Sequence, residues 1–287
     1  MTGEIAALLT ACCWVVAARL YRNLGASFSA LSLNFWKGLI SLLLLLPLGL
    51  LLPATELSTQ QQVLLLLSGA IGIGLGDTFF FLALGRLGDR QCLLVADTLA
   101  PLLTACLAIV WLSEWLLWQH WLGMALIFLA LERVLQAGKE QQQSASWSGL
   151  SFAALAALCQ AVGAVISRDI FLHSDVSVLQ ASNWRFVGGM LLIVPLMLLW
   201  RQRPLPRPAS NWRTWVLLLL AAVLGTTLAM LLQMLAFQLT KAAIAQTLLA
   251  TSIVLSLLLS KGLGDKIPKG SLSWTLAALL GVGLLLA

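Results

Sequence analysis

The stretch WKGLISLLLLLP at residues 36–47 returns as WRFVGGMLLIVP at residues 184–195. In both copies an indole and a basic side chain precede a long apolar run that ends at a proline. The matched positions, each followed by its repeat, are Cys13 and Cys159, Arg22 and Arg168, Trp36 and Trp184, Lys37 and Arg185, and Pro47 and Pro195. The offset is 146 residues for the first two pairs and 148 for the last three. The second half of the chain therefore repeats the first, with a two-residue insertion in one loop.

The composition is that of an integral membrane protein. Of the 287 residues, 60% are hydrophobic and only 10% are charged, and the mean hydropathy is +0.96. These values lie far outside the range of soluble globular domains. The N-terminus has no basic region, so we expect Ala6–Leu20 to belong to the first span and not to a cleaved signal peptide.

Apolar segments of about twenty residues, enough to cross roughly 30 Å of hydrocarbon, alternate with short polar segments along the whole chain. We predict ten spans, at Gly3–Tyr21, Ser29–Leu52, Val63–Leu84, Gln91–Ser113, Trp121–Leu135, Ser148–Arg168, Ser177–Trp200, Trp212–Phe237, Ala242–Ser260 and Ser271–Ala287. No polar stretch between them is long enough for a soluble domain.

The number of spans in each half decides how the halves are related. Five is odd, so the second copy must enter the membrane from the opposite side. We expect an all-α protein in which residues 1–140 form one five-helix repeat and residues 141–287 form the second, inverted repeat. Two inverted halves enclose a site that can open to either side in turn, which predicts a transporter and not an enzyme.

Basic residues gather in one set of loops. Of the 17 Lys and Arg residues, 13 lie at or near the loops after spans 1, 3, 5, 7 and 9, two at the opposite loops and two inside spans. The positive-inside rule then places these loops in the cytoplasm and both termini outside, in a plasma-membrane protein. Because the charges are scattered among short loops, the net charge of +6 does not indicate nucleic-acid binding.

The sequence carries no signature of metal, nucleotide or nucleophile chemistry. The five cysteines lie in apolar segments without CxxC or Cys/His spacing, and there is no Walker A, GxSxG or HExxH motif. We therefore expect no cofactor, no metal and no catalytic residue. An intramembrane enzyme for lipid-linked substrates would need a polar cluster at one interface, which only Arg86, Asp89 and Arg90 approach. A non-transporting scaffold is the other alternative.

Four charged residues fall inside predicted spans, where insertion costs about 2.5 to 3.5 kcal/mol each. Asp77 and Asp97 lie at similar depth if spans 3 and 4 form an antiparallel hairpin, so they are candidates to share a cavity and to carry protons or recognise cations. The alternative is that each carboxylate only forms hydrogen bonds to a neighbouring helix. Pro101 removes the amide that would bond to the carbonyl of Asp97, which predicts a kink beside that carboxylate.

The other two intramembrane charges, Lys37 and Arg185, are related by the repeat and fall at equal depths from opposite faces. They are candidates for anion recognition in a central cavity. The alternative is that each long side chain reaches back to the interface as an anchor. The adjacent Trp36 and Trp184 are expected either to stack on a solute or to anchor at the interface.

The repeat is symmetric in architecture but not in chemistry, because the acids occur in the first half only. The second half instead supplies the neutral groups Asn183, Gln233 and Gln246 at candidate binding positions. An asymmetric cavity of this kind suits an amphipathic metabolite. Pro47 and Pro195 match across the repeat, and together with Pro101 they are candidates for flexible points during gating, or for tolerated packing breaks.

The stretch GLGDTFFFLALGRLGDRQCLLVADTLAPLLTACLAIVWLSEWL, Gly74–Leu116, resembles the EamA family of the drug/metabolite transporter superfamily. That family has a similar ALxxL...LxPxxTxLLxxxxLxE run across its third and fourth helices, which ends here in Pro101, Thr104 and Glu114. A degenerate second copy without the proline follows from Ala236 to Asp265.

The resemblance implies a ten-helix secondary transporter, often an exporter of amino acids or other metabolites, driven by protons or by solute exchange. The expected partners are a small-molecule solute, protons and membrane lipid, in a monomer or homodimer. Members of the family are generally drawn with cytoplasmic termini, which conflicts with the loop charges and leaves the orientation open.

Overall fold

The computed structural model describes residues 2–24, 27–136, 146–202, 204–205, 211–262 and 271–286, and within these ranges all regular structure is helical. The first half contains α1 (Thr2–Leu24), α2 (Ala30–Leu51), α3 (Thr59–Gly69), the π-helical segment η1 (Ala70–Gly76), α4 (Asp77–Leu112) and α5 (Trp118–Gln136). The second contains α6 (Trp147–Leu172), α7 (Val178–Leu199), α8 (Trp212–Ala222), η2 (Val223–Leu228), α9 (Ala229–Leu239), α10 (Ala242–Ala250), α11 (Ser252–Gly262) and α12 (Ser271–Leu286).

Seven helical stretches in the described residues are long and apolar enough to cross a membrane, which makes the chain a multi-pass integral membrane protein. Large apolar side chains point outward along them, such as Leu43 and Leu50, which are 63% and 79% exposed. A surface of this kind is suited to lipid and not to water. The other three predicted spans fall on α5, on α10 with α11, and on α12, so the structure confirms the class but not the count of ten.

Equivalent serines begin the second long helix of each half. The Ser29 hydroxyl accepts a hydrogen bond from the Ser32 amide at 3.3 Å, and the Ser177 hydroxyl accepts one from the Gln180 amide at 3.2 Å. Each serine therefore satisfies one of the backbone donors that a helix start leaves free. The two caps are 148 residues apart, which is the offset of the sequence repeat.

A π-helical segment interrupts the third span of each half at corresponding positions. The segment η1 ends where Asp77 begins α4, and η2 ends where Ala229 begins α9, so the two are related by an offset of 152 residues. Wide turns of this type are rare and frequently occur at functional sites.

Helix α4 reverses direction within Asp77–Leu112. The Cys92 thiol lies 3.6 Å from the carbonyl oxygen of Phe80, although twelve residues of straight helix would separate them by about 18 Å. The predicted hairpin is therefore present, but its turn is made in helical conformation and not by the loop expected between residues 84 and 91.

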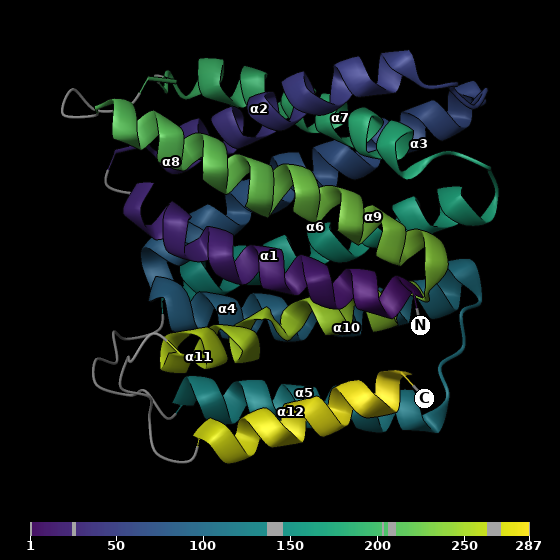
Figure 1. Ribbon diagram of the computed structural model, residues 1–287, viewed down its shortest axis with the longest axis vertical. Helices are drawn as coiled ribbons and strands as arrows, with labels where there is room; N and C mark the ends of the chain where they lie inside the picture. Colours follow the sequence, from purple (N-terminus) through teal and green to yellow (C-terminus); the bar gives the residue numbers. More distant parts are fainter. Residues whose placement is uncertain are drawn as a thin grey trace.

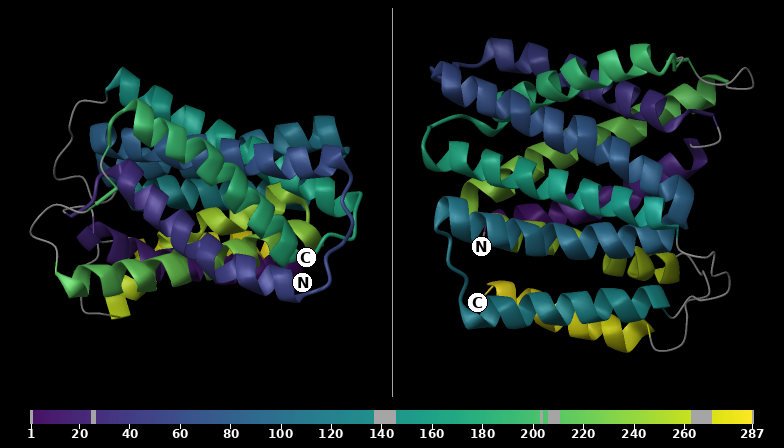
Figure 2. Two further views of the ribbon diagram at one scale, coloured as in Figure 1. Left: turned by 90° about the horizontal axis from the view of Figure 1, so that it is seen from above. Right: turned by 180° about the vertical axis from the view of Figure 1, so that it is seen from behind.

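The helices lie side by side in a flattened bundle with α2, α3 and α7 at one end of its long axis and the α5–α12 pair at the other (Figure 1, Figure 2). Both termini lie on the same side of the bundle. In the α5–α12 pair, a Cβ atom added to Gly123 would lie 2.8 Å from the Gly281 oxygen, and one added to Gly281 would lie 2.7 Å from the Gly123 oxygen. This reciprocal contact allows the two backbones to touch, as small residues do between membrane helices.

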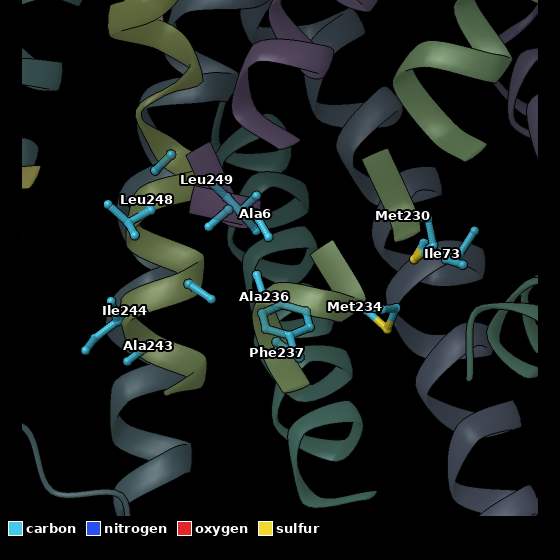
Figure 3. Close-up of a cluster of buried hydrophobic side chains, with 14 of the residues drawn as sticks. Ala6, Ile73, Met230, Met234, Ala236, Phe237, Ala243, Ile244, Leu248 and Leu249 are labelled. Carbon is cyan, nitrogen blue, oxygen red and sulfur yellow. The ribbon is translucent and has the colours of Figure 1, made fainter. Parts of the chain in front are cut away.

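The main hydrophobic core joins the two halves. Figure 3 shows Leu249 of α10 beside Ala6 of α1, and Met230 of α9 beside Ile73 of η1, and these residues belong to one buried cluster. The π-helical segment of the first half is thus held against the second half by apolar packing.

Candidate transport site

Lys37 and Asp77 form an ion pair in the interior of the bundle. The Lys37 Nζ lies 2.6 Å from the Asp77 Oδ2, and the two side chains are 13% and 21% exposed. Lys37 is seven residues into α2, about 11 Å from its start, and Asp77 begins α4 directly after η1. A Phe81 ring lies 5.5 Å from the Lys37 ammonium. The sequence placed these two residues in opposite recognition roles, and the structure brings them together.

Gln160 of α6, in the second half of the chain, lies beside the Lys37–Asp77 ion pair. Its Nε2 lies 3.5 Å from the Asp77 Oδ1 and 3.4 Å from the carbonyl oxygen of Gly72. Both distances are at the long limit for hydrogen bonds. In the part of the chain that the structure describes, the Asp77 carboxylate therefore has one strong partner, Lys37, and one weak partner, Gln160.

The polar face of α2 reaches both π-helical segments. Asn34, Lys37 and Ser41 are three and four residues apart and so lie on one face. The Asn34 Nδ2 donates to the Ile73 carbonyl in η1 at 3.3 Å, and the Ser41 hydroxyl lies 2.8 Å from the Thr227 hydroxyl in η2. Sequence reasoning missed Asn34 and Ser41, although their helical spacing around Lys37 was a usable signal.

Tyr21, the single tyrosine of the chain, is a further polar group that the sequence did not single out. Its hydroxyl donates to the Ala221 carbonyl at 3.0 Å and lies 2.9 Å from the Thr226 hydroxyl. Thr226 precedes Thr227 in η2, and the Thr227 hydroxyl lies 2.8 Å from the Ser41 hydroxyl of α2. These residues thus form one polar region between the two halves.

Arg185 is directed inward, with only 2% of the residue exposed. Its Nη1 donates to the Ser167 hydroxyl at 2.6 Å and lies at longer range from the Gly163 carbonyl oxygen, 3.5 Å, and the Met234 sulfur, 3.6 Å. The side chain does not reach a lipid interface in this conformation, which disfavours the anchor interpretation.

Asp97 has no hydrogen bond or ion pair to any other described residue, and the structure pairs Asp77 with Lys37. Whether the two acids share a cavity stays a prediction. Helix α4 continues through Pro101.

The remaining predicted residues occupy different environments. Trp36 donates from Nε1 to the Pro204 carbonyl at 2.7 Å, whereas Trp184 and Asn183 line a crevice of about 310 Å³ between α2 and α7. The Asn183 Nδ2 donates to the Leu45 carbonyl at 3.1 Å, close to Pro47.

Three further predicted residues lie in helices. Gln233 of α9 and Gln246 of α10 are buried, and Gln246 Oε1 has no hydrogen-bond partner among the described residues. Pro195 lies inside α7. The side chains of Asp89 and Arg90, considered for an intramembrane enzyme, lie outside the described residues.

A second polar cluster closes the side of the bundle on which the termini lie. The Arg168 Nε lies 2.6 Å from the Glu114 Oε1, and its Nη1 donates to the carbonyls of Phe237 and Gln238 at 3.0 and 2.8 Å. The other carboxylate oxygen of Glu114 accepts from the Ala242 amide at 3.0 Å. The ends of α4, α6, α9 and the start of α10 are thereby joined.

Comparison with known proteins agrees with this architecture. A solved structure described only as a crystal structure of a protein aligns with 98% of this chain and 95% of its own length, at a TM-score of 0.81 and 18% sequence identity. At that identity the likeness concerns the fold alone. No curated protein matches the chain. The model of the EamA-like transporter family matches residues 1–132 and again residues 147–287, so the chain belongs to the EamA-like transporter family.

Proposed function

We propose that this membrane transporter of the drug/metabolite type is a secondary active exporter of a small organic metabolite, such as an amino acid or another amphipathic solute. Ten spans in two inverted five-helix repeats would alternate access to the polar region around Lys37 and Asp77. Transport would be driven by protons or by exchange of solutes. The observation that carries the proposal is an interior ion pair, Lys37–Asp77, that is partly exposed and lies between residues of both halves.

An interior ion pair with few other bonds suits a transport site for a physical reason. Burying two charges is favourable only when they pair, and a pair held by little else can exchange partners with a solute or a proton. Among the described residues, Asp77 is bound strongly by Lys37 alone, and its Gln160 contact is long. Opening the pair therefore breaks a single strong contact.

The repetition of helices on which the proposed inversion depends is supported by three correspondences. Serine caps begin both α2 and α7, and a π-helical segment, η1 or η2, interrupts the third span of each half. The glycine contact between α5 and α12 likewise joins one helix from each half. A two-fold axis in the membrane plane would relate them.

Flux measurements test the function directly. Purified protein in liposomes is loaded with a mixture of amino acids and other metabolites, and efflux is followed with and without a pH gradient. Protein-dependent efflux of any of these solutes supports transport. A folded protein that moves none of them in either direction would favour the scaffold alternative, and chemical change of a lipid-linked substrate would favour the enzyme.

Cysteine labelling tests the orientation, for which we favour external termini on the basis of the loop charges. In a variant without native cysteines, Glu56→Cys lies in the exposed loop after α2 on the side of the termini, and Trp147→Cys lies at the opposite end of the bundle. An impermeant thiol reagent applied to intact cells should label position 56 and leave position 147 unlabelled. The reverse pattern would place the termini inside.

A further inference from the structure

The crevice of about 310 Å³ between α2 and α7 lies where the end of α2 meets the start of α7. Three of the leucines that line it, Leu46, Leu50 and Leu52, are exposed on the outside of the bundle. In a membrane these side chains contact acyl chains. A molecule can therefore enter the crevice directly from the lipid.

Asn183, which lines this crevice, has an acceptor that the described residues leave unsatisfied. The residue is only 8% exposed. Its Nδ2 donates to the Leu45 carbonyl, and because a carbonyl oxygen can only accept, the amide nitrogen must face α2. A Cβ atom added to Gly49 would collide with that nitrogen, so glycine allows this approach. The Asn183 Oδ1 then has no donor among the described residues, which costs free energy for a buried acceptor.

Trp184, the next residue, also lines the crevice and differs from its equivalent in the repeat. At the other end of the α2–α7 pair, the Trp36 Nε1 and the Ser32 hydroxyl both donate to the Pro204 carbonyl, at 2.7 and 2.6 Å. In the part of the chain that the structure describes, the Trp184 indole has no such acceptor. The protein therefore supplies a carbonyl at one end of the pair and leaves a crevice at the other.

The polar groups of the crevice select a neutral ligand group that both donates and accepts. Asn183 Oδ1 requires a donor and the Trp184 indole an acceptor, and a hydroxyl group supplies both. None of the described residues that line the crevice is charged, so a charged head would have no partner there. Asn183 lies six residues, about 9 Å, beyond the Ser177 cap, where an unpaired charge is costly.

We propose that this crevice binds a membrane lipid of the acylglycerol class, with a neutral, hydroxyl-bearing head and an acyl chain. A head hydroxyl donates to the Asn183 Oδ1, and a hydroxyl or ester oxygen of the lipid accepts from the Trp184 indole. The acyl chain lies against Leu46 and Leu50. Because α2 and α7 belong to different halves, the bound lipid contacts both. The inference does not depend on transport of a solute.

Photolabelling in phosphatidylcholine nanodiscs provides the test, because the phosphatidylcholine head has no hydroxyl. The probe is a monoacylglycerol with a photoreactive diazirine in its acyl chain, and mass spectrometry locates the label. We expect saturable labelling within residues 46–54 and 179–187, which line the crevice. Labelling confined to other helices would overturn the proposal.

Competition with unlabelled lipids tests the head group. Monooleoylglycerol should compete, whereas methyl oleate has the same chain and an ester but no hydroxyl. It should compete about fivefold more weakly, which is the effect of one lost hydrogen bond. Phosphatidylglycerol, whose hydroxyls accompany a charged phosphate, should compete no better than methyl oleate. Equal competition by monooleoylglycerol and either of the other two lipids would refute recognition of a neutral hydroxyl head.

Variants show whether the two polar groups are responsible. Trp184→Phe keeps an aromatic ring but removes the indole N–H, and it should weaken competition by monooleoylglycerol about fivefold. Trp36→Phe is the matched control and should label as the wild type does, since Pro204 already satisfies its indole. Asn183→Leu removes the acceptor and should act like Trp184→Phe. If Asn183→Leu does not fold, Trp184→Phe decides alone. Wild-type competition in Trp184→Phe, or an equal loss in Trp36→Phe, would contradict the assignment.

Discussion

The ion pairs Lys37–Asp77 and Arg168–Glu114, both in the described part of the bundle, have the same nitrogen to oxygen distance, 2.6 Å, but very different surroundings. Lys37–Asp77 has one long additional contact, to Gln160. Arg168–Glu114 is continued by two backbone carbonyls and one backbone amide, so that four helix ends are joined at once. The comparison teaches that the length of an ion pair does not reveal its role. The number of other groups that depend on it separates a structural junction from an exchangeable pair.

The largest expected effect is a loss of stability when the Arg168–Glu114 ion pair, which we call the junction, is broken. Glu114→Gln leaves the largely buried guanidinium of Arg168 without its carboxylate, and breaking a buried pair in this way costs about 3 kcal/mol. Thermal unfolding in detergent should show a clear loss relative to Glu56→Gln, an exposed control. Equal melting temperatures for the two variants would remove the distinction between the two ion pairs.

The next largest effect is expected on transport, when the exchangeable ion pair Lys37–Asp77 is changed. Asp77→Asn keeps the size of the side chain but cannot carry the charge, so we expect transport driven by a pH gradient to fall by about tenfold, equivalent to roughly 1.4 kcal/mol. Its melting temperature should fall less than that of Glu114→Gln, because fewer groups depend on Asp77. Asp175→Asn should transport as the wild type does. An Asp77→Asn protein with full gradient-driven flux would make this ion pair structural as well.

Asp97 extends the comparison to an acid that has no hydrogen bond or ion pair among the described residues. If Asp97 carries the coupled proton, Asp97→Asn should lose gradient-driven flux in liposomes yet keep solute counterflow, since exchange does not consume the gradient. If Asp97→Asn and Asp77→Asn both keep wild-type gradient-driven flux, proton coupling is abandoned in favour of exchange.

The smallest expected effect concerns His120, which lines the crevice beside Arg168 and Lys241 at the junction. Burial, and then the charge of Lys241, lower the pKa of His120 below its usual value. The folded protein therefore binds this proton less readily than the unfolded chain does, and stability should decline as the pH falls through the unfolded value of about 6.5.

Melting temperatures between pH 8 and pH 5 measure this dependence. His120→Gln should flatten the acidic decline, whereas His173→Gln, at a side chain that is 71% exposed, should keep it. An identical decline in wild type and His120→Gln would show that other groups set the acid stability of the junction.

The sequence by itself determined the class of the protein and its repeat. Hydropathy fixes which segments lie in lipid, and the matched Trp, basic and proline positions fix which helices correspond, because both are properties of residue order alone. The family resemblance carried by Gly74–Leu116 was confirmed in both halves. The four charged positions inside apolar spans could also be identified from the sequence, because placing a charged side chain in lipid is costly in free energy.

Only the tertiary structure decided which of these charges meet. Lys37 and Asp77 are forty residues apart, and their contact depends on how α2 packs against the end of η1, where glycines and a wide helical turn set the rotation of the next helix. Glu114 and Arg168 belong to different halves, and no local pattern predicts that a loop carboxylate will reach across the repeat. Partner choice between charges is a matter of distances in space, and helix packing sets those distances.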